Sequence, residues 1–321
     1  MGAFQSKNRF PVDGRTVIIT GGSEGMGKAL ARLLAQKGAN VLIVARTVQK
    51  LEVALKDISA AAIRPSSQRF HYISADLTNP SGPPRIISEA TAWNNGYTPE
   101  ILFCCAGASR PGLFIDMSNS AIKEQMEVNY YSAAYMAHAF LQPWLQNPTT
   151  PKTKEPKHIV FTSSIAAFLP IVGYSPYSPS KFAIRALSDS LSQELLLYQS
   201  ICDMRVHTVF PGTIFSPGLE TENLTKPAIT KKLEESDGGQ TPEEVAASSM
   251  KGLERGEELI TSGAIGLALK AGMLGCSRRN GWGIVDTVMG WIVLIVLVIV
   301  RRDMDGTVRK WGKERLGKDS G

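Results

Sequence analysis

The 321-residue chain is long enough to bury the core of one large domain plus an appendage, and 43% apolar with 20% charged residues exclude a disordered or fibrous protein. Its four cysteines lack C-x-x-C spacing and predict neither a disulfide framework nor a metal site. The net charge of +6 gathers most clearly after Val300, and the rest shows no basic stripe with interleaved aromatics, so nucleic-acid binding is not expected.

The N-terminal residues 1–12 are expected to form a short extension. They contain no apolar core of the kind that a secretory signal needs, so we expect the following domain to stay in the cytosol. Gly2 and Ser6 fit the loose Met-Gly-x-x-x-Ser pattern for myristoylation. An ordinary frayed terminus is the favoured alternative, because so short a pattern often occurs by chance.

Strand-like and helix-like segments alternate along residues 13–255. Apolar strands are predicted over residues 15–20, 40–45, 69–75, 100–107, 158–164 and 204–210. Helices are predicted over residues 26–37, 51–63, 85–93, 121–145 and 181–198. Because the strands are apolar throughout, they predict a parallel sheet with helices on both faces. We therefore expect an α/β fold, a doubly wound parallel sheet that forms a single domain.

Glycines gather at the first strand-to-helix turn, in the stretch TGGSEGMGKAL. Gly21, Gly25 and Gly27 allow the backbone to turn tightly and to approach a pyrophosphate, whose charge the helix N-terminus stabilises. Ser23 and Glu24 lie between these glycines and are expected to share the cofactor site. The spacing departs from the common G-x-G-x-x-G, and a glycine-rich turn without a ligand is the alternative.

The type of cofactor is indicated at the end of the second strand. Ala45 provides no carboxylate for an unmodified ribose, and Arg46 follows it. A guanidinium suits a 2′-phosphate, so the sequence predicts NADPH, with slight support from Lys50; a solvated surface arginine is the alternative. Asp76, beside Leu77, ends the third strand at the same edge. It either binds the adenine amino group or caps the following turn, and both residues are included in the predicted cofactor site.

Three residues carry the predicted chemistry. Tyr177 and Lys181 have a Tyr-x-x-x-Lys spacing, which places them on one face of a helix. An ammonium beside a phenol lowers the pKa of the phenol and makes it a general acid near neutral pH. Ser164 follows a strand, where its hydroxyl is placed to donate a hydrogen bond to a substrate carbonyl while Tyr177 protonates it.

Together these motifs resemble the classical short-chain dehydrogenase/reductases, which have the Rossmann fold, over about residues 13–255. The resemblance rests on Thr20, Gly21, Gly25, Gly27, the Cys104-Cys105-Ala106-Gly107 strand end, Asn129, Ser164, Tyr177 and Lys181. It implies that Tyr177 is the catalytic acid/base and that Ser164 orients the carbonyl. It also implies that Lys181 binds the nicotinamide ribose and tunes Tyr177, while Asn129 holds a water in the proton relay.

Two further positions follow from the resemblance. Ile214 and Ser216, after the Pro211-Gly212 pair, are implied to meet the nicotinamide carboxamide. The family usually has Asn-Asn-Ala-Gly or Asn-Cys-Ala-Gly at 104–107, and the missing first Asn predicts some loss of local stability with an intact reaction. Redox pairing of Cys104 with Cys105 is disfavoured, because vicinal residues on a strand point to opposite faces.

A narrower resemblance concerns the substrate. Residues 180–195, 216–227 and 241–257 are similar to the group of this family that reduces 3-ketodihydrosphingosine to dihydrosphingosine in sphingolipid synthesis. It implies an NADPH-dependent enzyme at the cytosolic face of the endoplasmic reticulum membrane, acting on a long-chain lipid ketone. A reductase for steroid, retinoid or 3-ketoacyl substrates is one alternative, and a non-catalytic, membrane-tethered NADP(H)-binding scaffold is another. A homodimer or homotetramer stays open.

Residues 256–321 are expected to form a membrane-associated region. Residues 280–300 carry one charge, Asp286, and as a helix they would extend about 31 Å, which is long enough to span the hydrocarbon core. The apolar helix itself is expected at about 282–300. A basic tail follows, and a single span would place it in the lumen, against the positive-inside tendency. If the weaker apolar stretch 259–276 re-enters or spans, both ends stay cytosolic. The sequence therefore slightly favours a hairpin or a monotopic arrangement.

Overall fold

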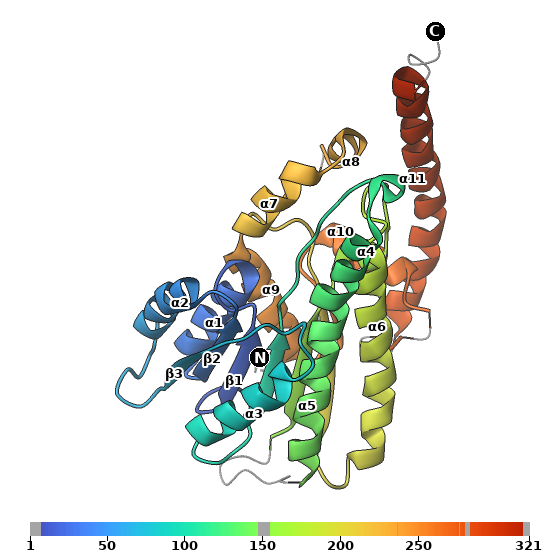
Figure 1. Ribbon diagram of the computed structural model, residues 1–321. Coiled ribbons are helices and arrows are strands. Elements are labelled where there is room, and N and C mark those ends of the chain that lie inside the picture. The colour runs from blue at the N-terminus through green and yellow to red at the C-terminus, as the bar shows by residue number, and fades with distance from the viewer. Residues whose placement is uncertain (1–7, 147–154, 236, 276, 280–282, 317–321) are drawn as a thin grey trace.

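The computed structural model describes residues 8–146, 155–235, 237–275, 277–279 and 283–316. In these residues the strands form one parallel sheet in the order β3-β2-β1-β4-β5-β6-β7 (Figure 1). The strands are β1 Thr16–Thr20, β2 Asn40–Ala45, β3 Phe70–Ser74, β4 Ile101–Cys104, β5 Lys157–Thr162, β6 Met204–Phe210 and β7 Leu259–Thr261. The order reverses between β1 and β4, which is where open α/β sheets bind their ligands. The predicted doubly wound parallel sheet is confirmed.

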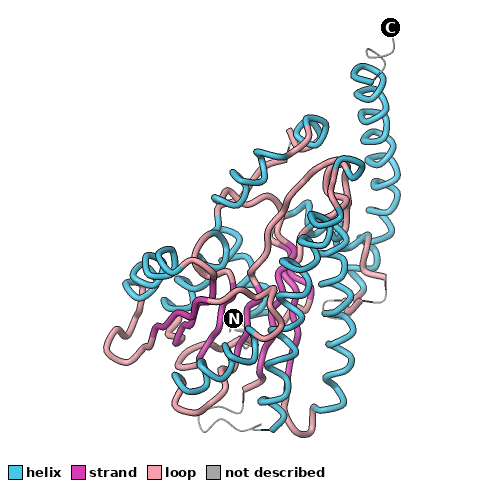
Figure 2. The backbone as a smooth tube through the Cα atoms, viewed as in Figure 1, coloured by secondary structure: helices cyan, strands magenta, loops and turns pink. Residues whose placement is uncertain are grey.

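Helices enclose this sheet on both faces (Figure 2). One face is covered by α1 Gly25–Gln36, α2 Val48–Ala60 and α9 Pro242–Arg255. The other face is covered by α3 Gly82–Trp93, α5 Ser132–Gln146 and α6 Tyr177–Glu194. The short helix α4 Asn119–Met126 packs against α6. Both faces of the apolar strands are therefore covered by helices.

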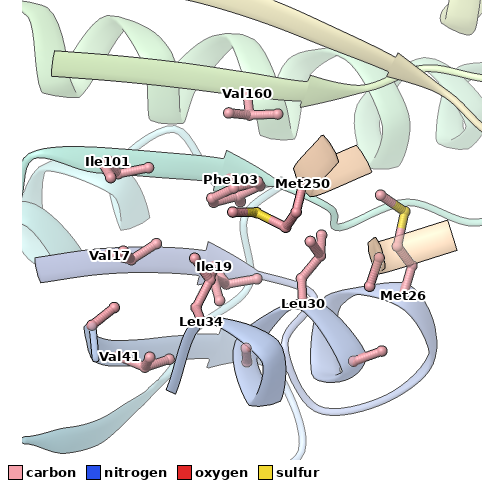
Figure 3. Close-up of a cluster of buried hydrophobic side chains, with 14 of the residues drawn as sticks. Val17, Ile19, Met26, Leu30, Leu34, Val41, Ile101, Phe103, Val160 and Met250 are labelled. Atoms are coloured by element: carbon pink, nitrogen blue, oxygen red, sulfur yellow. The ribbon is translucent and has the colours of Figure 1, made fainter. Parts of the chain in front are cut away.

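The side chains of β1 show how the core is divided. Val17 and Ile19 join the cluster formed with α1 and α9, to which Leu30 and Met250 belong (Figure 3). Ile18, between them, joins the cluster on the opposite face. All three β1 side chains are fully buried. Burying a side chain of this size stabilises the fold by about 1.5–3 kcal/mol, and here the strand gains on both faces.

The predicted helix over 121–145 is helical throughout in the structure, but it is not one regular α-helix. It is divided into α4, a π-helical turn at Glu127–Tyr131, and α5. A π turn holds an extra residue, which rotates the side chains that follow and is frequent at functional sites. This turn contains Asn129, whose side chain bonds backbone groups on both sides. Hydrophobic periodicity alone does not reveal such an insertion.

A second membrane span over 259–276, one of the two possibilities that the sequence offered, is wrong for the described residues, whereas re-entry stays a prediction. Its first residues form β7, which pairs in parallel with β6, and Ala264–Gly272 forms the nine-residue helix α10. The buried Lys270 donates from Nζ to the carbonyl oxygen of Leu259 at 3.1 Å and so ties the helix to the strand. A strand within the sheet and a helix this short cannot cross a bilayer. The sheet extends past residue 255, and the division into domains at that residue stays a prediction.

The C-terminal helix α11, Ile284–Leu316, runs beside α10 and projects beyond the rest of the described chain (Figure 1). Residues Ile284–Glu314 are long and apolar enough to cross a membrane, and only 11% of their most apolar window is buried. A narrow seam docks the helix: a Cβ at Gly290 would lie 2.8 Å from the Ala271 oxygen, and one at Gly272 would lie 2.9 Å from Val293. α11 contains the apolar run that the sequence indicated and most of the basic tail after it.

Some sequence expectations fall outside the described residues. These are the Gly2 and Ser6 myristoylation pattern, Cys276, Trp282 and the end of the basic tail from residue 317.

Two buried histidines connect β5 with β6. His207 donates from Nδ1 to the Glu257 carbonyl oxygen at 2.7 Å, so a neutral His207 accepts at Nε2 from Nδ1 of His158, 3.0 Å away. Burial lowers the pKa of His158 well below its usual value and lowers the pKa of His207 to about 4. Both rings are therefore neutral at physiological pH.

We expect acid to destabilise the protein through this pair. The unfolded chain binds a proton at His207 near pH 6.5, whereas the folded chain resists until about pH 4. The neutral His207 therefore contributes fully to the free energy of unfolding above about pH 6.5. This contribution, on the order of 3 kcal/mol, is lost as the pH falls from about 6.5 to about 4. Urea midpoints at pH 7, 6 and 5 measure it. His207→Asn, which does not titrate, should flatten the pH dependence; an unchanged slope would contradict the assignment.

Candidate active site

The sequence-predicted site residues lie along the carboxyl ends of β1, β2, β3, β5 and β6. This is the edge at which a doubly wound sheet binds its ligand, and loops from chain segments far apart in the sequence meet there. The turn after β1 faces the end of β4 and the loop after β6, as the glycine contacts below establish.

The glycines of the first turn are required by space. Gly21 has φ +66°, and a Cβ there would lie 2.8 Å from the Ala106 nitrogen at the end of β4. A Cβ at Gly27 would lie 2.3 Å from the Gly21 oxygen, so the start of α1 rests directly on the turn. Glu24 precedes α1 without capping it by its side chain. A close, uncapped helix start of this kind fits a pyrophosphate, which binds backbone N–H groups.

The residues proposed around the adenosine end differ in their surroundings. The Arg46 guanidinium is exposed and makes no hydrogen bond or ion pair within the described part of the chain. Lys50 and Glu24 pair with each other at 2.7 Å, both partly exposed. The Leu77 side chain lies in the core, so only its backbone is available to a ligand.

Asp76 caps the turn that follows β3, which is one of the two roles expected for it. Its Oδ1 accepts hydrogen bonds from the Thr78 nitrogen at 3.0 Å and the Thr78 hydroxyl at 2.8 Å. These bonds lower the pKa of Asp76, and the nearby Arg46 adds to the effect. The other oxygen, Oδ2, has no hydrogen bond among the described residues and remains available.

The structure brings Ser164, Tyr177 and Lys181 together. Tyr177 is the first residue of α6, and Lys181 follows one turn later with its Nζ 5.5 Å from the Tyr177 ring centroid. Lys181 is buried and donates to the Thr162 oxygen at 3.1 Å. Burial lowers the pKa of Lys181 to about 8, and the neighbouring Cys105 thiol partly opposes this.

The expected lowering of the Tyr177 pKa by Lys181 is not found. Burial raises the pKa of Tyr177, the Ser164 hydroxyl lowers it in part, and the Glu222 carboxylate raises it further. The reason is geometric, because the ammonium lies over the ring and directs its hydrogen bond to Thr162. A raised pKa keeps the phenol protonated at neutral pH, which is the form that donates a proton.

Asn129 lies against the same group. Its Nδ2 donates to the oxygens of Ala108 and Gln125, both at 2.9 Å, and its Oδ1 accepts from the Ala108 nitrogen at 3.1 Å. Both amide hydrogens are therefore used, and Oδ1 is the side-chain atom left to hold a relay water. A Cβ at Gly107 would lie 2.8 Å from this Oδ1 and 3.3 Å from Lys181 Nζ, so Gly107 separates the two side chains.

The loop after β6 closes the site beside the glycines. Ile214 forms an isolated bridge with Gln240, and Ser216 caps α7 Pro217–Thr225 by accepting from the Leu219 nitrogen. A Cβ at Gly25 would lie 3.6 Å from the Ser216 Cβ, so the structure brings these two predicted cofactor residues together.

The structure also places at the site two residues that sequence reasoning missed. Tyr174, on the loop before α6, donates its hydroxyl to Oε1 of Glu222 on α7. Its ring centroid is 5.9 Å from that of Tyr177. The sequence contained one signal for this part of the site. Glu222 and Lys226 have the i,i+4 spacing at which opposite charges on a helix form an ion pair.

The two vicinal cysteines lie on opposite faces of the sheet, as expected. Cys104 belongs to the core cluster with α5, and Cys105 packs against the cluster with α1. Thr162 donates its hydroxyl to Cys105 Sγ at 3.5 Å. Burial raises the pKa of Cys105 to about 11 and that of Cys104 well above its usual value. Both thiols are therefore protonated and unreactive at neutral pH.

Comparison with known proteins identifies relatives over nearly the full length. A family model described as short chain dehydrogenase matches residues 15–227. A 3-ketodihydrosphingosine reductase of Neurospora crassa is 46% identical over 318 residues, covering 98% of this chain and 87% of that protein. One from Aspergillus fumigatus is 46% identical over 319 residues, covering 95% and 86%.

Solved structures show the same fold. A short chain dehydrogenase/reductase from Burkholderia phymatum in complex with NAD has a TM-score of 0.71 at 19% identity, covering 85% of this chain and 98% of that one. L-Sorbose reductase from Gluconobacter frateurii, complexed with NADPH and L-sorbose, has a TM-score of 0.64 at 20% identity, covering 79% and 98%. At these identities the likeness concerns the fold alone.

Proposed function

The chain belongs to the short-chain dehydrogenase/reductase family, within its 3-ketodihydrosphingosine reductases, and from this we propose that it reduces 3-ketodihydrosphingosine to dihydrosphingosine in sphingolipid synthesis. The observation that carries the proposal is 46% identity over 98% of the chain to a protein of that name. The grouping of Ser164, Tyr177 and Lys181 at the carboxyl edge of the sheet supports a reductase over a non-catalytic scaffold, which does not need these side chains.

The proposed reaction divides its work among these side chains. A bound nicotinamide supplies the hydride that reaches the carbonyl carbon. Tyr177 gives its phenolic proton to the carbonyl oxygen, and Ser164 donates a hydrogen bond to the same oxygen. Lys181 would hold the nicotinamide ribose through its ammonium, whose hydrogen bond to the Thr162 oxygen fixes it over the Tyr177 ring. Asn129 holds the water through which a proton returns.

We propose NADPH as the reductant. The support is the free, exposed guanidinium of Arg46 directly after β2, together with the lack of a carboxylate at the end of that strand. The uncapped start of α1 on its glycine turn fits the pyrophosphate of either nicotinamide dinucleotide. The preference for NADPH over NADH is therefore assigned to Arg46.

Replacing Arg46 with alanine is expected to raise the KM for NADPH by about tenfold or more while changing the KM for NADH little, because a charged hydrogen bond to the 2′-phosphate is lost. Steady-state kinetics with both cofactors measure this. The control Lys50→Ala removes a cation that already pairs with Glu24 and should have a smaller effect. An unchanged ratio of the two KM values would rule out Arg46 as the selector.

We further propose that the protein is held monotopically at the cytosolic face of the endoplasmic reticulum membrane. The support is the seam between α10 and α11, which keeps the apolar half of α11 beside the reductase domain. Ile265 on α10 and Trp291 on α11 are 63% and 68% exposed and supply apolar surface for one leaflet.

A tag placed after Gly321 is therefore expected to be digested by protease added to sealed microsomes, at the same rate as an exposed loop of the reductase domain. Detergent-opened microsomes control for intrinsic cleavage. Protection of the tag in sealed microsomes alone would instead show that α11 crosses the bilayer.

The proposed substrate is tested with the purified full-length protein in mixed micelles, NADPH and 3-ketodihydrosphingosine. NADPH oxidation and dihydrosphingosine should appear in equal amounts. Turnover of a steroid, retinoid or 3-ketoacyl ketone alone would overturn the substrate and keep the mechanism. NADPH binding without reduction of any ketone would favour the scaffold.

A further inference from the structure

Three charged side chains of the α7–α8 segment, where α8 spans Ala228–Leu233, form a cluster. Lys226, which precedes α8, has its Nζ 2.9 Å from Oε1 of Glu222 and 2.6 Å from Oε2 of Glu234. The side chains are 5% exposed for Lys226 and 16% and 18% exposed for the two glutamates. Charges this deep are costly unless each finds a partner.

This cluster is attached to the loop before α6, which leads directly to Tyr177. Tyr174 donates to Glu222, and its ring lies next to that of Tyr177. The Thr230 hydroxyl on α8 donates to the Val172 oxygen at 2.9 Å, so both helices are fixed to the segment that leads into α6. The charge of Glu222 raises the pKa of Tyr177, which places this carboxylate within electrostatic reach of the proton donor.

The charges of the cluster do not balance. Two carboxylates face one ammonium. Asp237 adds a further carboxylate, whose pKa is raised by partial burial, and it lies close enough for Glu234 to raise this pKa further and for Lys226 to lower it. Lys231 and Lys232 on α8 are exposed, where water screens them. The excess negative charge of the cluster therefore favours the binding of one more cation.

Glu222 has an oxygen to offer that cation. Its contacts with Tyr174 and Lys226 both use Oε1, and Oε2 makes no hydrogen bond within the described residues. Lys226 retains Glu234 as a partner whatever Glu222 binds. Glu222 is thus a mostly buried carboxylate with one oxygen free of hydrogen bonds to the described residues, and Tyr174 connects it to the catalytic Tyr177.

We propose that Glu222 is a specificity-determining residue that binds the protonated amine on the carbon next to the ketone of the substrate. This inference rests on the proposed function, which supplies an amino ketone. The ammonium bound at Glu222 holds the adjacent carbonyl between Tyr177 and Ser164. Steroid, retinoid and 3-ketoacyl ketones carry no such amine and gain nothing from the cluster.

The test compares Glu222→Gln with the unchanged full-length protein on two ketones of equal chain length, 3-ketodihydrosphingosine and its analogue lacking the amine. Glutamine keeps the shape and removes the charge. The variant should lose about tenfold or more in kcat/KM on the amino ketone, mostly through KM, and much less on the des-amino ketone. The control Glu235→Gln changes an exposed neighbour that makes no hydrogen bond or ion pair within the described chain, and it should leave both values unaltered.

Two outcomes would overturn the proposal. Equal losses on both ketones would mean that Glu222 only fastens α7, and no loss on either would mean that it does not meet the substrate. Should the variant fail to fold, the unchanged protein still decides, because it must prefer the amino ketone to the des-amino analogue by about tenfold or more. Failure of the proposed function is distinct, since the unchanged protein would then reduce neither ketone.

Discussion

Replacing Tyr177 with phenylalanine is expected to lower kcat for ketone reduction by roughly 10²–10⁴-fold, the usual contribution of a positioned general acid. The phenol hydroxyl is the proposed proton source, and burial keeps it protonated. NADPH affinity should change little, because the ring and the position of Lys181 are retained. Single-turnover rates and a fluorescence titration with NADPH measure the two quantities separately.

A matched control is Tyr97→Phe, which removes a phenol hydroxyl from an exposed turn before β4, at the opposite edge of the sheet. It should behave as the unchanged protein. A Tyr177→Phe variant that kept kcat within tenfold would exclude Tyr177 as the acid.

The second large effect concerns the glycine turn. Gly27→Ala places a Cβ 2.3 Å from the Gly21 oxygen, which forces the start of α1 away from the turn. Overpacking of this kind costs about 1–3 kcal/mol. If that cost falls on the phosphate site, the Kd for NADPH rises roughly 10- to 100-fold, as isothermal titration would show.

Gly306→Ala provides the comparison, because a Cβ on this α11 residue meets nothing within 4 Å. It should bind NADPH normally. If Gly27→Ala also bound NADPH normally, the close contact between Gly27 and Gly21 would not be needed for the phosphate site.

Most of the fold was predictable because each strand is a short apolar run ended by a turn residue or a charge. The predictions for Asn40–Ala45 and Met204–Phe210 match β2 and β6 residue for residue. The stretch 259–276 was considered as a membrane span because an apolar run has the same sequence pattern whether a neighbouring strand or lipid covers it. Its pairing with β6 depends on a partner far away in the sequence.

The candidate site was predictable where a motif carries it. The glycines and the Tyr-x-x-x-Lys pair are local patterns with local geometric causes. The bond from Tyr174 to Glu222 was not, because it joins residues 48 positions apart through a loop and a helix whose docking no pattern encodes. The pKa of Tyr177 likewise depends on burial, which spacing does not report.

The proposed reaction requires hydride transfer to the carbonyl carbon of the substrate, and deuterium labelling follows this transfer. The full-length protein is given 3-ketodihydrosphingosine and NADPH that is doubly deuterated at C4 of the nicotinamide, and the product is analysed by mass spectrometry. We expect dihydrosphingosine with one deuterium, bound to the carbon that carried the ketone. Dihydrosphingosine without deuterium at that carbon, or no dihydrosphingosine at all, would contradict the proposed reaction.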